Sequence, residues 1–185
     1  MVPLRVRSCF SLLRGTASPA SLCSRAAGFG YNGMALTDLE NLYGLWSFLA
    51  ACERHRIRPI IGTEIETGAA DRLVLLVGNE VGYRNLCNII SRRKRKEKLE
   101  VSPETASWYE GLILLSRSET VLRTSRECGL EAAADLGSRP TEEGSRLRHL
   151  AATLGIPAVA VPDSDLGGPG ERRAQLLLRA IGAGE

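Results

Sequence analysis

The sequence predicts an α/β protein in which short strands alternate with helices, arranged as an α/β barrel or a barrel-like sheet. Two observations favour this class. Apolar runs of about four to six residues recur without polar alternation, as expected of parallel strands covered on both faces. Between these runs lie amphipathic segments with helical spacing, almost to the end of the chain. In such a fold, sites form at the carboxyl ends of the strands.

Six segments are expected to form strands. Each is a short apolar run bounded by polar residues or glycine, and they span residues 2–7, 33–38, 58–66, 72–78, 111–116 and 156–163. A small turn at residues 68–71 separates the third strand from the fourth. The runs lack alternation, so we expect the strands to be parallel and buried on both sides.

Five segments are expected to form helices, at residues 18–30, 41–56, 81–93, 141–155 and 170–182. In the first, Ser18 is the expected N-cap, Pro19 takes the first helical position and glycines end the helix. Tyr43 and Trp46 lie in the second, where we expect them to pack in the core. Residues 119–140 show no clear pattern, and no element is assigned there.

Composition excludes several classes of protein. Of the 185 residues, 44% are hydrophobic and 24% charged, which argues against a disordered chain. No apolar stretch approaches the ~20 residues of a membrane span, and a net charge of +3 does not by itself indicate a nucleic-acid binder. The five cysteines form no CxxC pair and their number is odd, so neither a zinc site nor a disulfide framework is indicated. We expect reduced thiols and a cytoplasmic location.

Polar residues stand where the expected strands end. Two arginines close the first strand, acids close the second, third and last, and serines follow the fifth; these are Arg5, Arg7, Asp38, Glu64, Glu66, Ser116, Ser118, Asp163 and Asp165. Converging carboxylates repel one another unless a cation neutralises them. That cation is either a bound metal or a fixed arginine.

The order of several segments resembles the PHP (polymerase and histidinol phosphatase) domain at the N-terminus of bacterial DNA polymerase III alpha subunits. The segments are RVRSCFSLLRG, GMALTDLENLYG, IRPIIGTEIE, LVLLVGNEVGYRNLCNIISR, GLILLS and LGIPAVAVPDSDL, and the ending ERRAQLLLRAIG leans toward the error-prone paralogue. The resemblance implies a distorted (β/α)7-type barrel, incomplete or open where residues 119–140 are short. We expect one PHP-like domain over residues 1–185, with no polymerase domain in it.

The resemblance also implies a site that binds up to three divalent metals (zinc, manganese or magnesium) for phosphoester hydrolysis. The family's opening His-x-His falls on Arg5 and Arg7, its Asp-His pair on Asp38 and Leu39, and its metal-bridging glutamate on Glu64. Arginine has no lone pair to offer a metal and stays charged at every accessible pH.

The other family positions show the same loss of histidine. A family histidine falls near Lys94, a cysteine near Ser118, and the closing Asp-x-His on Asp163 and Asp165. The acids are present and the histidine ligands are not. Both histidines of the chain lie in expected helical segments, away from the strand ends.

We therefore expect a vestigial metal pocket in which Arg5 and Arg7 replace the metals and pair with Asp38, Glu64 and Asp163. Its members are Arg5, Arg7, Asp38, Leu39, Glu64, Lys94, Ser118, Asp163 and Asp165. No catalytic residue and no cofactor is expected. Two alternatives stay open: the arginines point to solvent, or Asp38, Glu64 and Asp163 still hold a metal.

The resemblance then implies a non-hydrolytic domain with a structural or interaction role in DNA replication or translesion synthesis. Its partners would be DNA polymerase or other replication and repair subunits. The alternatives are an active metal-dependent phosphoesterase with an unusual carboxylate ligand set, and a truncated polymerase remnant.

Two further surfaces are candidates for contacts. A basic run is a candidate patch for phosphate or an acidic partner, made of Arg92, Arg93, Lys94, Arg95 and Lys96. It lacks interleaved aromatic residues, so direct DNA binding is only weakly indicated. An open barrel would expose sheet edges and favour a homodimer. No membrane partner is expected.

Overall fold

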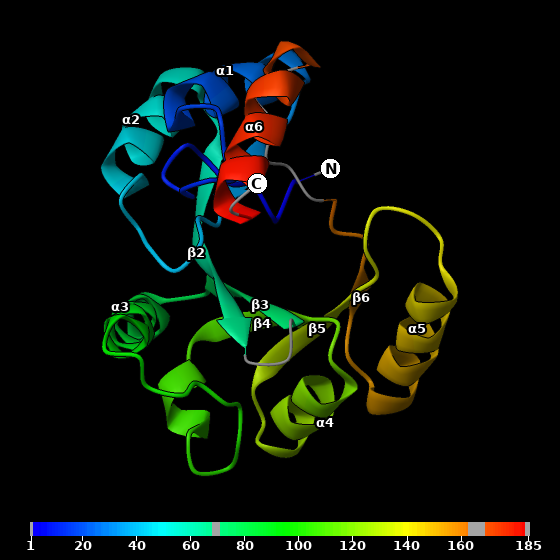
Figure 1. The fold of residues 1–185 in the computed structure, drawn as a ribbon. Helices are drawn as coiled ribbons and strands as arrows, with labels where there is room; N and C mark the ends of the chain where they lie inside the picture. Colours follow the sequence, from blue (N-terminus) through cyan, green and yellow to red (C-terminus); the bar gives the residue numbers. More distant parts are fainter. Residues whose placement is uncertain (1, 68–70, 163–168, 184–185) are drawn as a thin grey trace. The chain divides into compact units, whose positions relative to one another are not determined.

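The computed structural model describes residues 2–67, 71–162 and 169–183 (Figure 1). The chain divides into two compact units, which are described in turn: residues 1–61 with 163–185 form unit 1, and residues 62–162 form unit 2. Strand β2 (Arg58–Thr67) contributes residues to both.

Unit 1 combines three helices with a short parallel strand pair. Its described elements are α1 (Pro19–Gly28), β1 (Gly33–Leu36), α2 (Leu45–His55), the first residues of β2, the 3-10 helix η2 (Pro169–Glu171) and α6 (Arg172–Ala183). β1 pairs with β2 in parallel, from Gly33 opposite Arg58 to Leu36 opposite Ile61. As expected, α1 begins after the N-cap Ser18, whose side chain accepts a hydrogen bond from the Ser21 backbone N–H.

The N-terminal segment pairs with the edge of β1 that does not face β2. The backbone N–H of Ala35 donates to the Pro3 carbonyl (2.9 Å), and that of Thr37 donates to the Val6 carbonyl (2.8 Å). The expected strand at residues 2–7 is therefore wrong as a regular strand, since only Val6 forms a bridge there. Pro3 has no N–H to donate, which limits regular pairing.

The core of unit 1 lies where α1 and α2 pack side by side (Figure 1). Phe48 and the thiols of Cys23 and Cys52 are buried there, with the two sulfur atoms 3.6 Å apart. The expectation that Tyr43 and Trp46 belong to the core is wrong, because they are 65% and 78% exposed. Since α2 begins only at Leu45, its inward face carries Leu45, Phe48, Ala51 and Cys52 instead.

Unit 2 is a sheet with helices packed on it. Its described elements are the second half of β2, β3 (Asp71–Val77), α3 (Glu80–Lys94), the 3-10 helix η1 (Ala106–Tyr109), β4 (Leu112–Ser116), α4 (Glu119–Glu127), β5 (Glu131–Asp135), α5 (Glu142–Leu154) and β6 (Ala158–Val159). The strands are hydrogen-bonded in the order β2-β3-β4-β5-β6. Leucines of β3 and β4 fill the core.

The mixed α/β class is confirmed, but two features differ from expectation. β3 runs antiparallel to both β2 and β4, so the expectation of parallel strands throughout is wrong; β4, β5 and β6 are parallel. Only three residues separate β2 from β3, too few for the crossover helix that a parallel pair needs, and the turn expected at residues 68–71 falls largely outside the described residues. Residues 119–140, left unassigned above, form α4 and β5. Among the described helices, none is both long and apolar enough to cross a membrane.

Candidate functional site

Asp38 follows β1 and is enclosed by hydrogen-bond donors from the N-terminal loop. Its Oδ1 accepts from the Ser8 backbone N–H (2.7 Å) and the Ser11 hydroxyl (2.6 Å), and its Oδ2 accepts from the Ser8 hydroxyl (2.7 Å). The residue is 1% exposed. Both oxygens are therefore engaged within unit 1.

A tight loop brings the two serines to Asp38. A Cβ at Gly15 would lie 1.9 Å from the carbonyl oxygen of Ser8, so only glycine allows the two backbone segments to approach this closely. The Ser11 hydroxyl also accepts a hydrogen bond from the backbone N–H of Leu39 (3.0 Å). The loop and the end of β1 are thus fixed to each other.

Glu64 lies on β2 in unit 2 and is paired with an arginine that was not expected. The Nη1 of Arg72 on β3 is 3.1 Å from the Oε1 of Glu64, and its Nη2 is 3.3 Å from the Oε1 of Glu66. Glu66 lies opposite Arg72 in the antiparallel register, and Glu64 lies opposite Val74. Glu64 is fully buried, so the Arg72 guanidinium pairs with a desolvated carboxylate.

Arg5 and Arg7 are buried in unit 1, at 7% and 1% exposure. The alternative in which they point to solvent is therefore wrong. Their pairing with Asp38, Glu64 and Asp163 stays a prediction, and Asp163 and Asp165 lie outside the described residues.

The remaining family positions differ in burial. Lys94 is exposed in the last turn of α3, and Leu39 is half-buried. Ser118 is the N-cap residue of α4, but its side chain makes no capping hydrogen bond. Within the described parts of the chain, no group of three or more His, Cys, Asp or Glu side chains is arranged to hold a metal.

The basic run at the end of α3 is partly neutralised by its own neighbours. The guanidinium of Arg92 stacks on the Trp108 ring at 4.0 Å and donates to Glu97 (2.9 Å). Arg95 donates to the same carboxylate (2.7 Å), and this bond, with a smaller effect from Arg92, lowers the pKa of Glu97. The phosphate or partner patch stays a prediction, and Glu97 already neutralises part of its positive charge.

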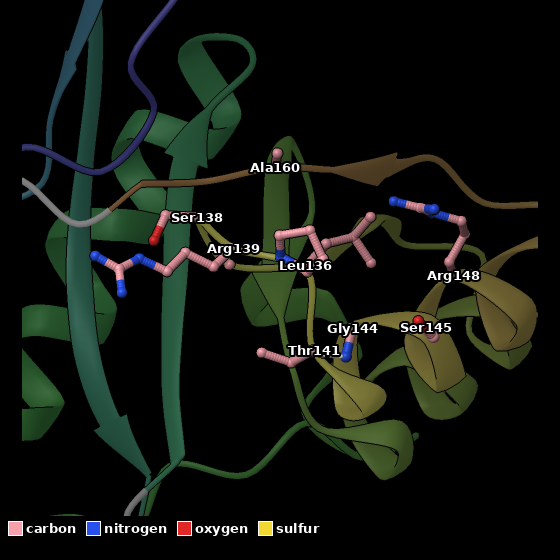
Figure 2. A pocket seen from close by; sticks show the side chains of 10 residues that line it. Leu136, Ser138, Arg139, Thr141, Gly144, Ser145, Arg148 and Ala160 are labelled. Atoms are coloured by element: carbon pink, nitrogen blue, oxygen red, sulfur yellow. Dashed lines mark hydrogen bonds between the residues drawn. The ribbon is translucent and has the colours of Figure 1, made fainter.

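Unit 2 also contains a pocket of about 200 Å³ where the chain passes from β5 into α5 (Figure 2). Arg139 and Arg148 line it, but Figure 2 shows the guanidinium group of Arg139 extending away from that of Arg148. Thr141 caps α5 by accepting the Gly144 backbone N–H (2.9 Å). The two positive charges therefore do not converge on one bound group.

At the described family ligand positions, a divalent metal would meet competition from the chain's own groups. A metal would have to compete for Asp38 with three hydrogen-bond donors, and for Glu64 with the guanidinium of Arg72. Arginine stands at both positions of the opening histidine pair, where it adds fixed positive charge.

Sequence comparison finds one matching domain family and relatives that are bacterial DNA polymerases. The PHP domain family matches residues 3–139. The error-prone DNA polymerase of Anaeromyxobacter dehalogenans is 32% identical over 86% of this chain and 16% of its own length. DNA polymerase III subunit alpha of Bacillus subtilis is 31% identical over the whole chain and 19% of its own length. The chain thus spans less than a fifth of these polymerases.

Solved structures with low sequence identity share the fold. An amidohydrolase from Chromobacterium violaceum, with bound sulfate and no metal, has a TM-score of 0.70 at 15% identity, covering 92% of this chain and 88% of its own. A two-domain protein from Bacteroides vulgatus, which contains a predicted PHP-like metal-dependent phosphoesterase, has a TM-score of 0.61 at 11% identity, covering 90% and 52%. At such identities the likeness concerns the fold alone.

Proposed function

Because this chain belongs to the PHP family, we propose that it is a PHP domain without metal-dependent hydrolase activity, acting through structure or interaction in DNA replication or translesion synthesis. The enclosed carboxylate of Asp38 carries this proposal. Three donors occupy its two oxygens, and two of them are serine hydroxyls. A metal that activates water needs ligands with available lone pairs, and these donors already occupy three of the about four lone-pair positions of this carboxylate.

The interaction role is supported by the relatives, which are DNA polymerases, and by the exposed aromatic residues of unit 1. Tyr43 and Trp46 are large apolar side chains in contact with solvent, and such residues are enriched at protein interfaces. The proposed partner is a DNA polymerase or another replication subunit, in the cytoplasm.

The hydrolase part of the proposal is tested by an assay on bis-p-nitrophenyl phosphate with Mn²⁺, Zn²⁺ or Mg²⁺ added in turn. We expect the same rate for the parent, for Asp38→Ala and for the metal salt alone. Metal content measured by elemental mass spectrometry is expected to be far below one ion per chain. Metal-dependent turnover that falls about tenfold or more in Asp38→Ala would overturn the proposal.

The interaction part is tested by sedimentation with the purified polymerase III alpha subunit of the same organism. A complex is expected with the parent, and weaker binding with Trp46→Ala, since a buried aromatic contact at an interface often contributes more than about 1 kcal/mol. Ala50→Ser, on an exposed position of the same helix, is the matched control. Absence of any complex with the polymerase subunit would contradict the interaction role.

A further inference from the structure

We infer that Arg72 is a built-in cationic partner of Glu64, and that this ion pair helps the carboxylate at the family's metal-bridging position to stay buried in the sheet. The inference assigns a role in stability to a residue on β3, a strand that carries none of the family's ligand positions.

The geometry rests on the hairpin formed by β2 and β3. Glu64 and Glu66 are two residues apart on β2, so their side chains leave the same face of the strand. Arg72 lies opposite Glu66 on β3, and its two terminal nitrogens reach one carboxylate each, at 3.1 and 3.3 Å. One planar guanidinium thus holds two acids that would otherwise repel each other.

The burial of the partners distinguishes this ion pair from an exposed ion pair on α4. The Glu64 side chain is 0% exposed and that of Arg72 is 23% exposed, whereas the Arg123–Glu119 pair on α4 is 50% and 62% exposed. A buried carboxylate that loses a cationic partner is left in a medium that solvates charge poorly, and this is strongly destabilising. An exposed pair is screened by water and contributes little.

The inference rests on the proposed function, because a working metal site would need Glu64 as a ligand. The two can fail separately. Metal-dependent turnover by the parent protein would overturn the proposed function, while the unfolding experiment below addresses the ion pair alone.

The experiment compares thermal unfolding of the full chain with those of Arg72→Leu, Arg72→Lys, Glu64→Gln and the double variant Glu64→Gln/Arg72→Leu. We expect Arg72→Leu to lower Tm by about 5–10 °C, because a buried carboxylate loses a cationic partner. Arg72→Lys keeps the positive charge but lacks the two terminal nitrogens of the guanidinium, and its Tm is expected to fall less than that of Arg72→Leu. The double variant should melt above Arg72→Leu, since the buried carboxylate charge is removed together with Arg72.

Arg123→Leu is the matched control, with an expected Tm change within about 2 °C. A Tm of Arg72→Leu within about 2 °C of the parent, or additive effects in the double variant, would overturn the inference. Where Arg72→Leu does not fold, folding of the double variant supports it. If neither folds while Glu64→Gln does, Arg72 serves some purpose other than Glu64, and the inference is wrong.

Discussion

At the scale of single residues, burial changes the acidity of two side chains in a way that affects stability. Burial, and then the neighbouring Cys23 thiol, raise the pKa of Cys52 from 9.0 to about 12. Burial, and then the charge of Glu100, raise the pKa of Tyr109 from 10.0 to about 12. In the unfolded chain both groups lose their protons at lower pH than in the folded protein.

Stability is therefore expected to be fully present below pH 9 and to fall as the pH rises from 9 toward 12, because the unfolded state releases protons that the folded state keeps. Urea unfolding at pH 8, 10 and 11 measures this. The Cys52→Ala variant should show a shallower decline, whatever its stability at pH 8. A free energy of unfolding that stays constant to pH 11 would count against the buried thiol and phenol as the cause.

The residues of the candidate site were only partly predictable from the sequence. Family positions located Arg5, Arg7, Asp38 and Glu64, and all four are buried as a site requires. The serines that bind Asp38 and the arginine that pairs with Glu64 were not predicted. Ser8 and Ser11 reach Asp38 only through a loop that closes at Gly15, and Arg72 reaches Glu64 only through the β2–β3 register. Neither spatial relation is visible as a spacing in the chain.

At the scale of elements, the N-caps of α4 and α5 allow a helix start with a side-chain capping bond to be compared with one that lacks it. The Thr141 hydroxyl accepts the Gly144 backbone N–H at the start of α5, whereas the Ser118 side chain makes no such bond at α4. Thr141→Ala is expected to lower the free energy of unfolding by about 1 kcal/mol, since an N–H at the helix start loses its acceptor. Ser118→Ala is expected to change it by less than about 0.5 kcal/mol.

Chemical denaturation of the two variants in parallel checks this pair. Equal losses for Thr141→Ala and Ser118→Ala would mean that the capping bond at α5 does not stabilise the helix as its geometry indicates.

Helices with strong terminal signals were predicted well and weak strands were not. Ser18 and Pro19 marked the start of α1, and Gly155 ends α5 with a left-handed backbone (φ 66°). β5 has the sequence EAAAD, which offers alanine and flanking acids rather than the β-branched residues typical of strands, so it was missed. It is paired between β4 and β6, and α4 and α5 pack against it.

At the scale of the whole molecule, the two compact units predict different behaviour of fragments. The ladders from β2 to β6 and helices α3, α4 and α5 all lie within residues 62–162, which form one continuous stretch. Residues 1–61 lack η2 and α6, although Thr16 donates a hydrogen bond to Glu171 in η2. Unit 1 thus needs both stretches of the chain.

A fragment of residues 62–162 is therefore expected to unfold cooperatively in urea and to show helical circular dichroism. The fragment of residues 1–61 is the comparison and is expected to be largely unfolded, because it lacks α6 and the partner of Thr16. A non-cooperative 62–162 fragment would mean that its sheet depends on residues outside it. Sedimentation of the full chain measures the homodimer, which stays a prediction.

Because Pro3 and Val6 pair with β1, the N-terminal segment protects this strand edge from aggregation. A protease cut or a shortened expression product that removes them would leave the N–H groups of Ala35 and Thr37 facing outward. Uncovered strand edges recruit other chains by the same hydrogen bonds. A preparation with heterogeneous N-termini would then contain a truncated fraction that nucleates aggregation, while the intact protein stays in solution.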